Sequence, residues 1–192
     1  CATPARNARA MIDRRPLSPH NEVLYGNGYR ATRGRNAVAK MIHLNGFSQC
    51  SICHHSKGQW KHPLDASSTG YRDVNHWVDI ARTLERGCFD SLFFADVHGT
   101  YSTYQGTRDT AVRHAVQFPD NDPILLVSAL ALATEHIGIA CTFSATYFPP
   151  YHTAKTFSTL DHLSNGRVGW NIVTSYLEDA NANFGLHDQL PH

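Results

Sequence analysis

From residue 41 onward, short apolar runs alternate with longer segments of helical spacing. The runs are typical of buried strands, because they are short, rich in apolar side chains and bounded by Gly or polar residues. They span residues 41–47, 88–96, 136–146 and 167–175. The intervening helical segments span residues 74–86, 124–136 and 153–166. This alternation predicts an α/β fold in which parallel strands are joined by helices.

Polar and conformationally special residues mark the ends of these helices. Asp73 can cap the first helix, and Gly87 can stop it. The pair Asp122-Pro123 is a good start for the second helix, since Pro suits the first helical position. Asn165-Gly166 closes the third.

The connections favour one of two parallel architectures. Long polar loops follow the first two strands, whereas the helix-to-strand connections are short, as in a barrel whose active face lies at the strand carboxyl ends. No G-x-G-x-x-G follows the first strand, which lowers the case for a doubly wound nucleotide-binding sheet. We therefore predict a (β/α)8 TIM barrel of which residues 41–192 form the N-terminal half, about four βα units. The chain is expected to be a fragment of a protein roughly twice as long.

Charge excludes some classes of protein and separates residues 1–40 from the rest. The whole chain carries a net charge of +1, which argues against a nucleic-acid-binding protein held by bulk charge, and no run approaches a membrane span of about 20 apolar residues. Residues 1–40 hold seven Arg and one Lys against Asp13 and Glu22, a net charge of +6. We expect a basic, disordered extension, or sequence upstream of a start at Met41, in a cytoplasmic protein. An organellar transit peptide is the alternative.

The five cysteines are too sparse for a disulfide scaffold and odd in number. Cys88 and Cys141 lie in apolar segments and are expected in the core. The run from Cys50 to His54 matches C-x-x-C-H, so a haem or metal module remains an alternative. The other interpretations are a loop with incidental thiols, and a loop that places His54 at the mouth of the barrel.

Neutral hydrogen-bonding side chains gather where the strands end. Asp96 closes the second strand, and a carboxylate that ends an apolar strand is costly unless it is paired or lies at the mouth. No Ser-His-Asp or paired-carboxylate arrangement is visible, so the rim suits an organic cofactor that brings its own reactivity. The rim residues at the ends of the third and fourth strands are Thr142, Ser144, Asn171, Thr174 and Ser175.

Four stretches of the chain resemble a known family. They are FFADVHGTY, RDTAVRHAVQFPDNDPILLVSALA, TFSATYFPPYHTAKTFSTLDHLSNGRVGWNIVTS and ANFGLHDQLPH. They are similar to the FMN-dependent monooxygenases related to nitrilotriacetate, dibenzothiophene-sulfone and long-chain-alkane monooxygenases, within the bacterial-luciferase-like superfamily. The likeness runs from about residue 41 to residue 192, and residues 1–40 fall outside it.

The resemblance implies a two-component monooxygenase. A separate NAD(P)H:flavin reductase would supply FMNH2, and the oxygenase would use O2 to insert one oxygen atom into a small organic substrate through a C4a-hydroperoxyflavin. The full-length protein is expected to be a homo-oligomer, with no resident metal. The resemblance carries flavin contacts onto Asp96, Thr142 and His192. It carries the catalytic and substrate-side positions onto His54, Tyr101, Gln117, Asn171 and Tyr176.

The chain departs from the family pattern at several points. The Asp-Glu-Arg-Tyr run that usually follows the last histidine is missing, and with it a flavin-contacting Tyr. Pro191 replaces a usual acidic residue, and Ser51 replaces a Cys of the alkane-oxidising branch, so no substrate is assigned. The alternative is a truncated, non-catalytic remnant, which a stop codon directly downstream in the gene would support.

Overall fold

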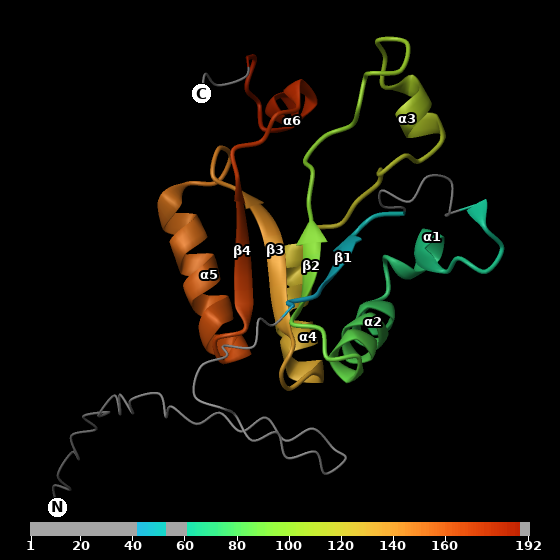
Figure 1. Ribbon diagram of the computed structural model, residues 1–192. Coiled ribbons are helices and arrows are strands. Elements are labelled where there is room, and N and C mark those ends of the chain that lie inside the picture. Colours follow the sequence, from blue (N-terminus) through green and yellow to red (C-terminus); the bar gives the residue numbers. More distant parts are fainter. Residues whose placement is uncertain (1–41, 53–60, 189–192) are drawn as a thin grey trace, which may run out of the picture. The chain divides into compact units, whose positions relative to one another are not determined.

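The described part of the chain is built on four parallel strands in sequential order. The structure is a computed structural model that describes residues 42–52 and 61–188. The sheet order is β1-β2-β3-β4, and every pairing is parallel (Figure 1). A doubly wound sheet reverses its strand order at a switch point, whereas successive strands of a barrel lie side by side. The predicted α/β barrel class is confirmed. The strands are β1 (Asn45–Gln49), β2 (Ser91–Ala95), β3 (Gly138–Ser144) and β4 (Val168–Val173).

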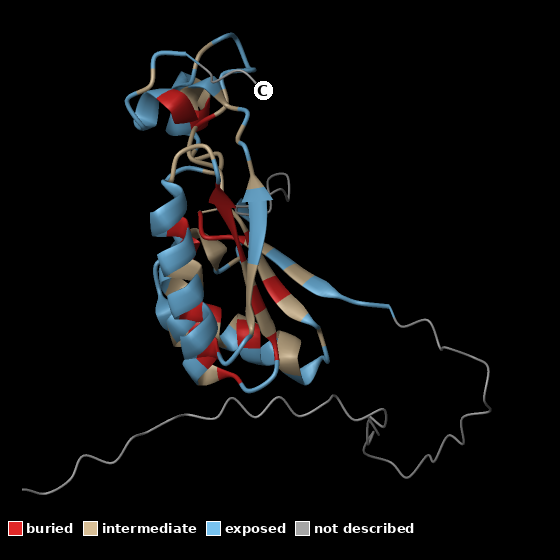
Figure 2. Ribbon diagram, turned by 90° about the vertical axis from the view of Figure 1, so that its left-hand side faces the viewer, coloured by how far each residue is buried: buried red, intermediate tan, exposed pale blue. Residues whose placement is uncertain are grey.

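Helices cover one face of this sheet. Three of them, α2 (Val74–Arg86), α4 (Val127–Ala133) and α5 (Pro150–Ser164), lie along the strands on the same side (Figures 1 and 2). A 3-10 turn, η2 (Pro123–Leu126), precedes α4. Two further short helices, α1 (Ser67–Gly70) and α3 (Asp109–Arg113), lie in the long polar loops predicted after the first two strands. A third, α6 (Glu178–Asn183), follows β4.

The hydrophobic core lies between the sheet and these helices. Leu92 and Phe94 of β2 are buried because alternate residues of a strand point to the same face. Trp77 of α2 is 2% exposed, packs edge-to-face on Phe94 with ring centroids 5.1 Å apart, and donates its indole N–H to the carbonyl of Tyr71. Ala81, four residues after Trp77, is also buried, so the two residues share the face of α2 that packs on the core.

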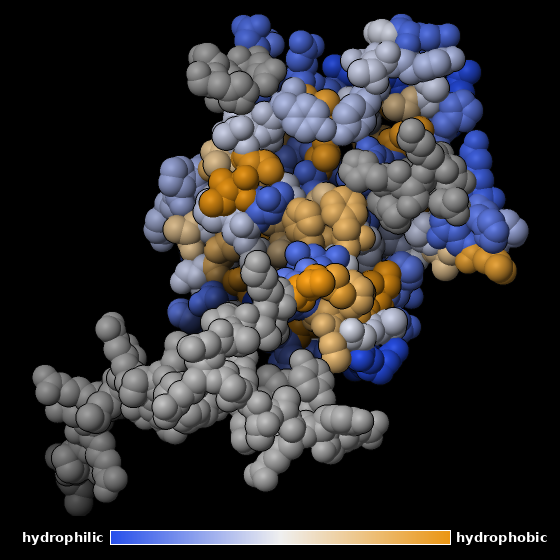
Figure 3. All heavy atoms as spheres, in the orientation of Figure 1, coloured by the Kyte–Doolittle hydropathy of each residue, from blue (hydrophilic) through white to orange (hydrophobic). Residues whose placement is uncertain are grey.

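The opposite face of the sheet carries apolar side chains that remain partly exposed. Phe47 of β1 is 45% exposed and contacts Phe93 of β2 in an edge-to-face pair. Next along this face, a Cβ on Gly169 would lie 2.9 Å from the Cβ of Ala140, so glycine allows the close approach of the two strands. Hydrophobic side chains gather in the middle of this view of the molecule (Figure 3). In a closed barrel this face is the interior.

The strands are shorter than predicted. The first begins at Asn45 and ends at Gln49, not at residues 41 and 47, because Asp90 binds the preceding segment. Its carboxylate accepts from the backbone N–H of Leu44 and contacts the ring of His43. The second begins at Ser91, since the turn after α2 occupies the preceding residues. The third strand is two residues shorter than predicted at each end, and the fourth is one residue shorter at its start and two at its end, as pairing stops there.

The helix starts follow the predicted caps. The side chain of Asp73 accepts from the N–H of Asn75, and that of Asp122 accepts from the N–H of Ile124. The Asp122-Pro123 start opens a 3-10 turn before the α-helix, so the second helix is shorter than residues 124–136. The third helix starts earlier than predicted, at Pro150, and Asn165 closes it in the left-handed conformation.

The prediction that Cys88 belongs to the core is wrong. The first helix ends at Arg86 as expected, but the left-handed residue after it is Cys88, with φ of 58°, rather than Gly87. The N–H of Phe89 then bonds back to the carbonyl of Leu84, which leaves the Cys88 thiol exposed in the turn. Cys141, by contrast, is fully buried as predicted.

Among residues 42–52 and 61–188, no helix is long and apolar enough to cross a membrane. These residues belong to one compact unit, Met41–His192. The predicted basic extension over residues 1–40 lies outside the described residues and stays a prediction.

Candidate functional site

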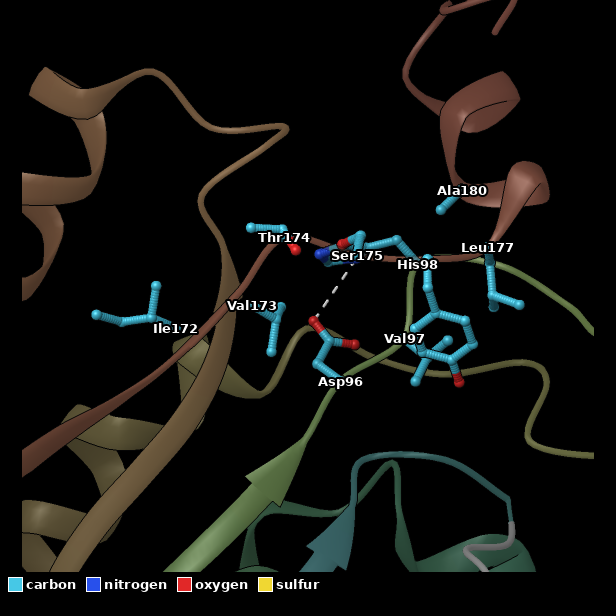
Figure 4. Close-up of a pocket in the computed structure, with 10 residues that line it drawn as sticks. Asp96, Val97, His98, Ile172, Val173, Thr174, Ser175, Leu177 and Ala180 are labelled. Carbon is cyan, nitrogen blue, oxygen red and sulfur yellow. Dashed lines mark ion pairs between the residues drawn. The ribbon is translucent and has the colours of Figure 1, made fainter. Parts of the chain in front are cut away.

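The first residue beyond β2 is Asp96, and it faces a cavity of about 440 Å3. Figure 4 shows its carboxylate turned toward His98 and the β4 side of the cavity. The strand end is the reason for this position, because β2 stops pairing with β1 at Ala95 and Asp96 is the next residue. Apolar side chains form most of the remaining wall: Val97, Ile172, Val173, Leu177 and Ala180.

Asp96 and His98, two titratable groups of the cavity, are poorly hydrated. The Asp96 side chain is only 8% exposed, and burial, together with the charges of Asp120 and Asp122, raises its pKa to about 7. Desolvation lowers the pKa of His98 below its ordinary value. His98 Nδ1 lies 3.6 Å from Asp96 Oδ2. Near neutral pH the site therefore presents mainly uncharged hydrogen-bonding groups and one carboxyl that exchanges a proton easily.

A second, much smaller cavity lies beside Asp96. Gln49, at the end of β1, accepts a hydrogen bond at its Oε1 from Nε2 of Gln117, 3.0 Å away, and both line this space. Asp120 lines it too, and desolvation is the main cause that raises the pKa of Asp120 to about 6. Asp96 thus stands between two spaces and belongs to the walls of both.

Thr142 and Asn171 form a hydrogen-bonded pair on adjacent strands. The two residues are register partners in β3 and β4, and the Asn171 amide donates from Nδ2 to the Thr142 hydroxyl at 2.9 Å. Thr142 is 5% exposed. Neither residue lines the 440 Å3 cavity; Val173, two residues beyond Asn171 on the same face of β4, does.

Tyr101 and Tyr176 meet at the edge of the cavity. Their hydroxyl oxygens are 2.6 Å apart, and Tyr176 lines the cavity. Desolvation, aided by the hydrogen bond from Tyr176, raises the pKa of Tyr101 to about 12. The Tyr101 phenol is therefore protonated near neutral pH, and the pair can offer a hydrogen bond to a bound molecule.

The predicted site residues thus fall into three neighbouring groups. Asp96 and Tyr176 share the large cavity, with Tyr101 bonded to Tyr176; Gln117 shares the small cavity with Asp96; and Thr142 pairs with Asn171. His54 and His192 lie outside the described residues, so their predicted roles stay predictions.

Sequence reasoning missed some residues of these cavities. His98 was passed over although it follows the strand-ending Asp96 by two residues, and a histidine in a loop at a strand end is a usable signal. Gln49 was placed in a loop, because the first strand was expected to end at residue 47. Asp120 reaches the small cavity through a loop, and nothing in its spacing indicated this.

Cys50 of the C-x-x-C-H run belongs to the core. It is 3% exposed, and its thiol lies 3.8 Å from the carbonyl of Tyr71. Cys53 and His54 lie outside the described residues, so the haem or metal alternative stays untested at those positions. Among the residues that the structure does describe, no group of three or more His, Cys, Asp or Glu could hold a metal ion.

The large cavity has the chemistry of a site for a planar organic ring. Pockets for organic cofactors are mostly apolar, with a few placed polar groups and a volume of about 300–1,000 Å3. Here the apolar side chains supply walls, while Asp96, His98 and Ser175 supply polar atoms. A flavin ring combines flat aromatic faces with a polar edge, and the residues present fit such a group.

Sequence comparison identifies relatives of this chain. The profile of the family described as luciferase-like monooxygenase matches residues 55–192. Long-chain alkane monooxygenase of Geobacillus thermodenitrificans (strain NG80-2) is 49% identical over 155 residues, which are 81% of this chain and 35% of that protein. Nitrilotriacetate monooxygenase component A of Aminobacter aminovorans is 36% identical over 159 residues, which are 80% of this chain and 34% of that protein.

Solved structures give the same result. A crystal structure of long-chain alkane monooxygenase matches with a TM-score of 0.76 and 50% identity, covering 80% of this chain and 35% of that one. A crystal structure of riboflavin lyase with modified FMN and the substrate riboflavin matches with a TM-score of 0.71 and 30% identity. The match covers 77% of this chain and 33% of that one. This chain spans about a third of the length of these relatives. Because the family profile covers most of it, the chain belongs to the luciferase-like monooxygenase family.

Proposed function

We propose that the complete gene product is the oxygenase component of an FMNH2-dependent, two-component monooxygenase that inserts one atom of O2 into a small organic substrate. The observation that carries this is the position of Asp96: a nearly buried carboxyl at a strand end, on the wall of an apolar cavity of about 440 Å3. Family membership and the relatives that are named monooxygenases support the same reaction class.

Reduced FMN, when bound, supplies the electrons that activate O2. The chain's own residues bind, orient and shield it. Asp96 can hydrogen-bond the polar edge of the ring either as a donor, when protonated, or as an acceptor, when ionised. Val173, Leu177 and Ala180 line the cavity and exclude water from the ring's surroundings. We assign Thr142 and His192 as the further cofactor contacts.

The substrate side is proposed on the remaining positions. Tyr101 and Tyr176 can donate a hydrogen bond to a polar atom of the substrate, and Gln117 is held by Gln49 in a fixed orientation. These assignments specify the substrate only as a small organic molecule. The catalytic and substrate-side set is His54, Tyr101, Gln117, Asn171 and Tyr176.

The partner is proposed to be a separate NAD(P)H:flavin reductase. The related nitrilotriacetate enzyme is named component A, which supports a system of more than one component. Association into homo-oligomers and a cytoplasmic location stay predictions.

The test is an anaerobic titration of the complete gene product with photoreduced FMN. We expect saturable binding, which Asp96→Ala weakens by about tenfold or more, the effect of losing one strong hydrogen bond. Asp90→Asn is the matched control, because Asp90 precedes the same strand at its other end and lies far from the cavity lining. Failure of the wild-type protein to bind reduced FMN would overturn the proposal. Affinities of Asp96→Ala and Thr142→Val that both equal that of wild type would show that the pocket lies elsewhere.

A further inference from the structure

The connection that follows β2 is fastened to α6 through one carboxylate. Asp179 Oδ2 accepts hydrogen bonds from the backbone N–H of Thr100 at 2.8 Å and from its hydroxyl at 2.6 Å. The other oxygen, Oδ1, lies 2.6 Å from Nη2 of Arg108. The Asp179 side chain is only 11% exposed, so these contacts are largely shielded from water. One side chain thus holds residues 100 and 108 of the same connection.

Two further contacts show that this segment lies directly against α6. A Cβ on Gly99 would lie 2.8 Å from the backbone nitrogen of Ala180, so only glycine allows the observed approach. The amide of Asn183 donates to the carbonyl of His98 at 2.8 Å. The ring of His98 also packs edge-to-face on Phe184, just beyond the helix. Residues 98–100 therefore contact α6 and the residue after it at several points, and the attachment does not depend on a single surface ion pair.

The residues that this contact orients are those at the edge of the cavity. Tyr101 follows Thr100 directly, and Tyr176 precedes Asp179 by three residues. The hydroxyls of the two tyrosines are 2.6 Å apart, while Tyr176 lines the 440 Å3 cavity. The tyrosine pair therefore bridges the two segments that Asp179 joins. Asp179 itself is not among the residues that line the cavity, so it can influence the cavity only through the segments that it joins.

We propose that Asp179 is a positioning residue: by holding Thr100 and Arg108 against α6, it sets Tyr101 against Tyr176 and so fixes one wall of the cavity. This inference rests on the proposed function only for its ligand, because the geometry of the two segments is independent of what the cavity binds.

The charge of Asp179 is suited to this role. Desolvation disfavours the ionised form, but the two bonds from Thr100 and the charge of Arg108 outweigh it and hold the pKa of Asp179 below its ordinary value. The carboxylate is therefore ionised throughout the neutral range and accepts all three bonds at once. An amide in its place offers one acceptor oxygen, so Asp179→Asn must lose at least one of them.

The first experiment measures the attachment of the connection without any flavin. Tyr104 lies within the connection and is 62% exposed, so limited chymotrypsin cleavage after Tyr104 in the complete gene product reports its release from α6. Cleavage after Tyr151, an exposed residue of α5, is the internal reference. We expect Asp179→Asn to speed cleavage after Tyr104 by about tenfold relative to Tyr151, as the loss of a charge-assisted bond implies. The control Glu178→Gln removes the neighbouring exposed charge and should leave the ratio within about twofold.

A double-mutant cycle separates positioning from a merely structural role. Tyr176→Phe removes only the hydroxyl contact, and it should speed cleavage after Tyr104 in the wild-type background. If Asp179 positions Tyr101, the contact is already lost in Asp179→Asn, and adding Tyr176→Phe changes nothing further. Equal effects of Tyr176→Phe in both backgrounds would overturn the proposal, and so would an unchanged cleavage ratio in Asp179→Asn.

The second readout is the dissociation constant for photoreduced FMN, measured anaerobically with wild type, Asp179→Asn, Tyr176→Phe, the double variant and Glu178→Gln. Asp179→Asn should weaken FMN binding several-fold, and adding Tyr176→Phe to it should weaken binding no further. Glu178→Gln should leave the dissociation constant unchanged. Absence of FMN binding in the wild-type protein would contradict the proposed function alone. The cleavage cycle would then still decide whether Asp179 positions the tyrosine pair.

Discussion

The amide of Asn171 donates a hydrogen bond to the hydroxyl of Thr142 across two adjacent strands, with a distance of 2.9 Å between Nδ2 and Oγ1. The two side chains were assigned to different sides of the proposed site, Thr142 to the flavin and Asn171 to the substrate. Their bond joins these sides through the rigid part of the sheet. Register fixes the pair, since Thr142 and Asn171 are direct partners of β3 and β4.

Replacing Thr142 should test this bond directly. Thr142→Val keeps the shape of the side chain but removes the hydroxyl, which should weaken binding of reduced FMN by about tenfold and leave the Asn171 amide without its acceptor. Thr142→Ser keeps the hydroxyl and should bind nearly as well as wild type. Anaerobic titration of both variants provides the measurement. Similar affinities for the Val and Ser variants would mean that the hydroxyl has no part in binding.

Asp96 should make the protein less stable as the pH rises. Its pKa is about 7 in the folded state against 3.8 ordinarily, so the folded protein keeps a proton that the unfolded chain loses near pH 4. Stability therefore falls between about pH 4 and about pH 7 and levels off above, by about 1.4 kcal/mol for each unit of pKa difference. Asp96→Asn has no proton to lose, so it should flatten this slope and raise the melting temperature at pH 8.

The measurement is the thermal midpoint of unfolding of wild type and Asp96→Asn, taken at intervals of about half a pH unit between about pH 4.5 and about pH 8. Asp90→Asn is the control, because the pKa of Asp90 is shifted in the opposite direction from that of Asp96. The hydrogen bond from His43 is the main cause that lowers the pKa of Asp90, so Asp90 stabilises the folded state above its ordinary pKa. A pH slope in Asp96→Asn as steep as that of wild type would show that Asp96 is ionised in the folded protein.

Arg167 should be among the most important single side chains for stability at the amino-terminal end of the sheet. Its guanidinium donates to the carbonyls of Ala131, Thr134, Ile137 and Ser164, and to the hydroxyl of Thr134. Lysine has one ammonium group and cannot reach these acceptors together. Arg167→Lys should lower the free energy of unfolding by about 2–4 kcal/mol, because carbonyls are left without donors.

Urea denaturation monitored by tryptophan fluorescence measures this loss. Arg113→Lys, on the exposed face of α3, is the control and should change stability by less than about 0.5 kcal/mol. A loss of similar size in both variants would mean that the carbonyl contacts of Arg167 contribute little.

The cysteines should differ sharply in reactivity. Cys88 is exposed, whereas burial raises the pKa of Cys50 to about 12 and also raises that of Cys141. Because the thiolate is the reactive form, iodoacetamide should label Cys88 in the native protein and should label Cys50 and Cys141 only after unfolding. Peptide mass spectrometry after a short pulse distinguishes them. Rapid native labelling of Cys50 would contradict its place in the core.

Local signals were sufficient for the order and type of the main elements. Short apolar runs predicted β2 and β3, and helical spacing over residues 74–86 predicted α2. The caps at Asp73 and Asp122 were correct because a carboxylate satisfies free N–H groups of the first turn wherever the helix packs. The short helices α1, α3 and α6 have no such period, and their polar sequences gave no signal.

Cys88 and Gln49 show why strand ends were misplaced. Gln49 pairs with Ala95, far along the chain, and the register between β1 and β2 extends the first strand to it. Cys88 is exposed by a local turn in which the N–H of Phe89 bonds to the carbonyl of Leu84. The sequence pattern records only that these segments are apolar. It does not record where pairing starts or stops.

By itself, then, the sequence determined the barrel-type order of strands and helices and the resemblance that led to Asp96, Thr142 and Tyr176. Local periodicity and short motifs carry that information. Only the tertiary structure decided that Tyr101 meets Tyr176, that Asp179 holds Thr100, and that His98 shares a cavity with Asp96. Such contacts join residues from separate strands and loops, so their geometry exists only once the parallel sheet has brought the strand ends together.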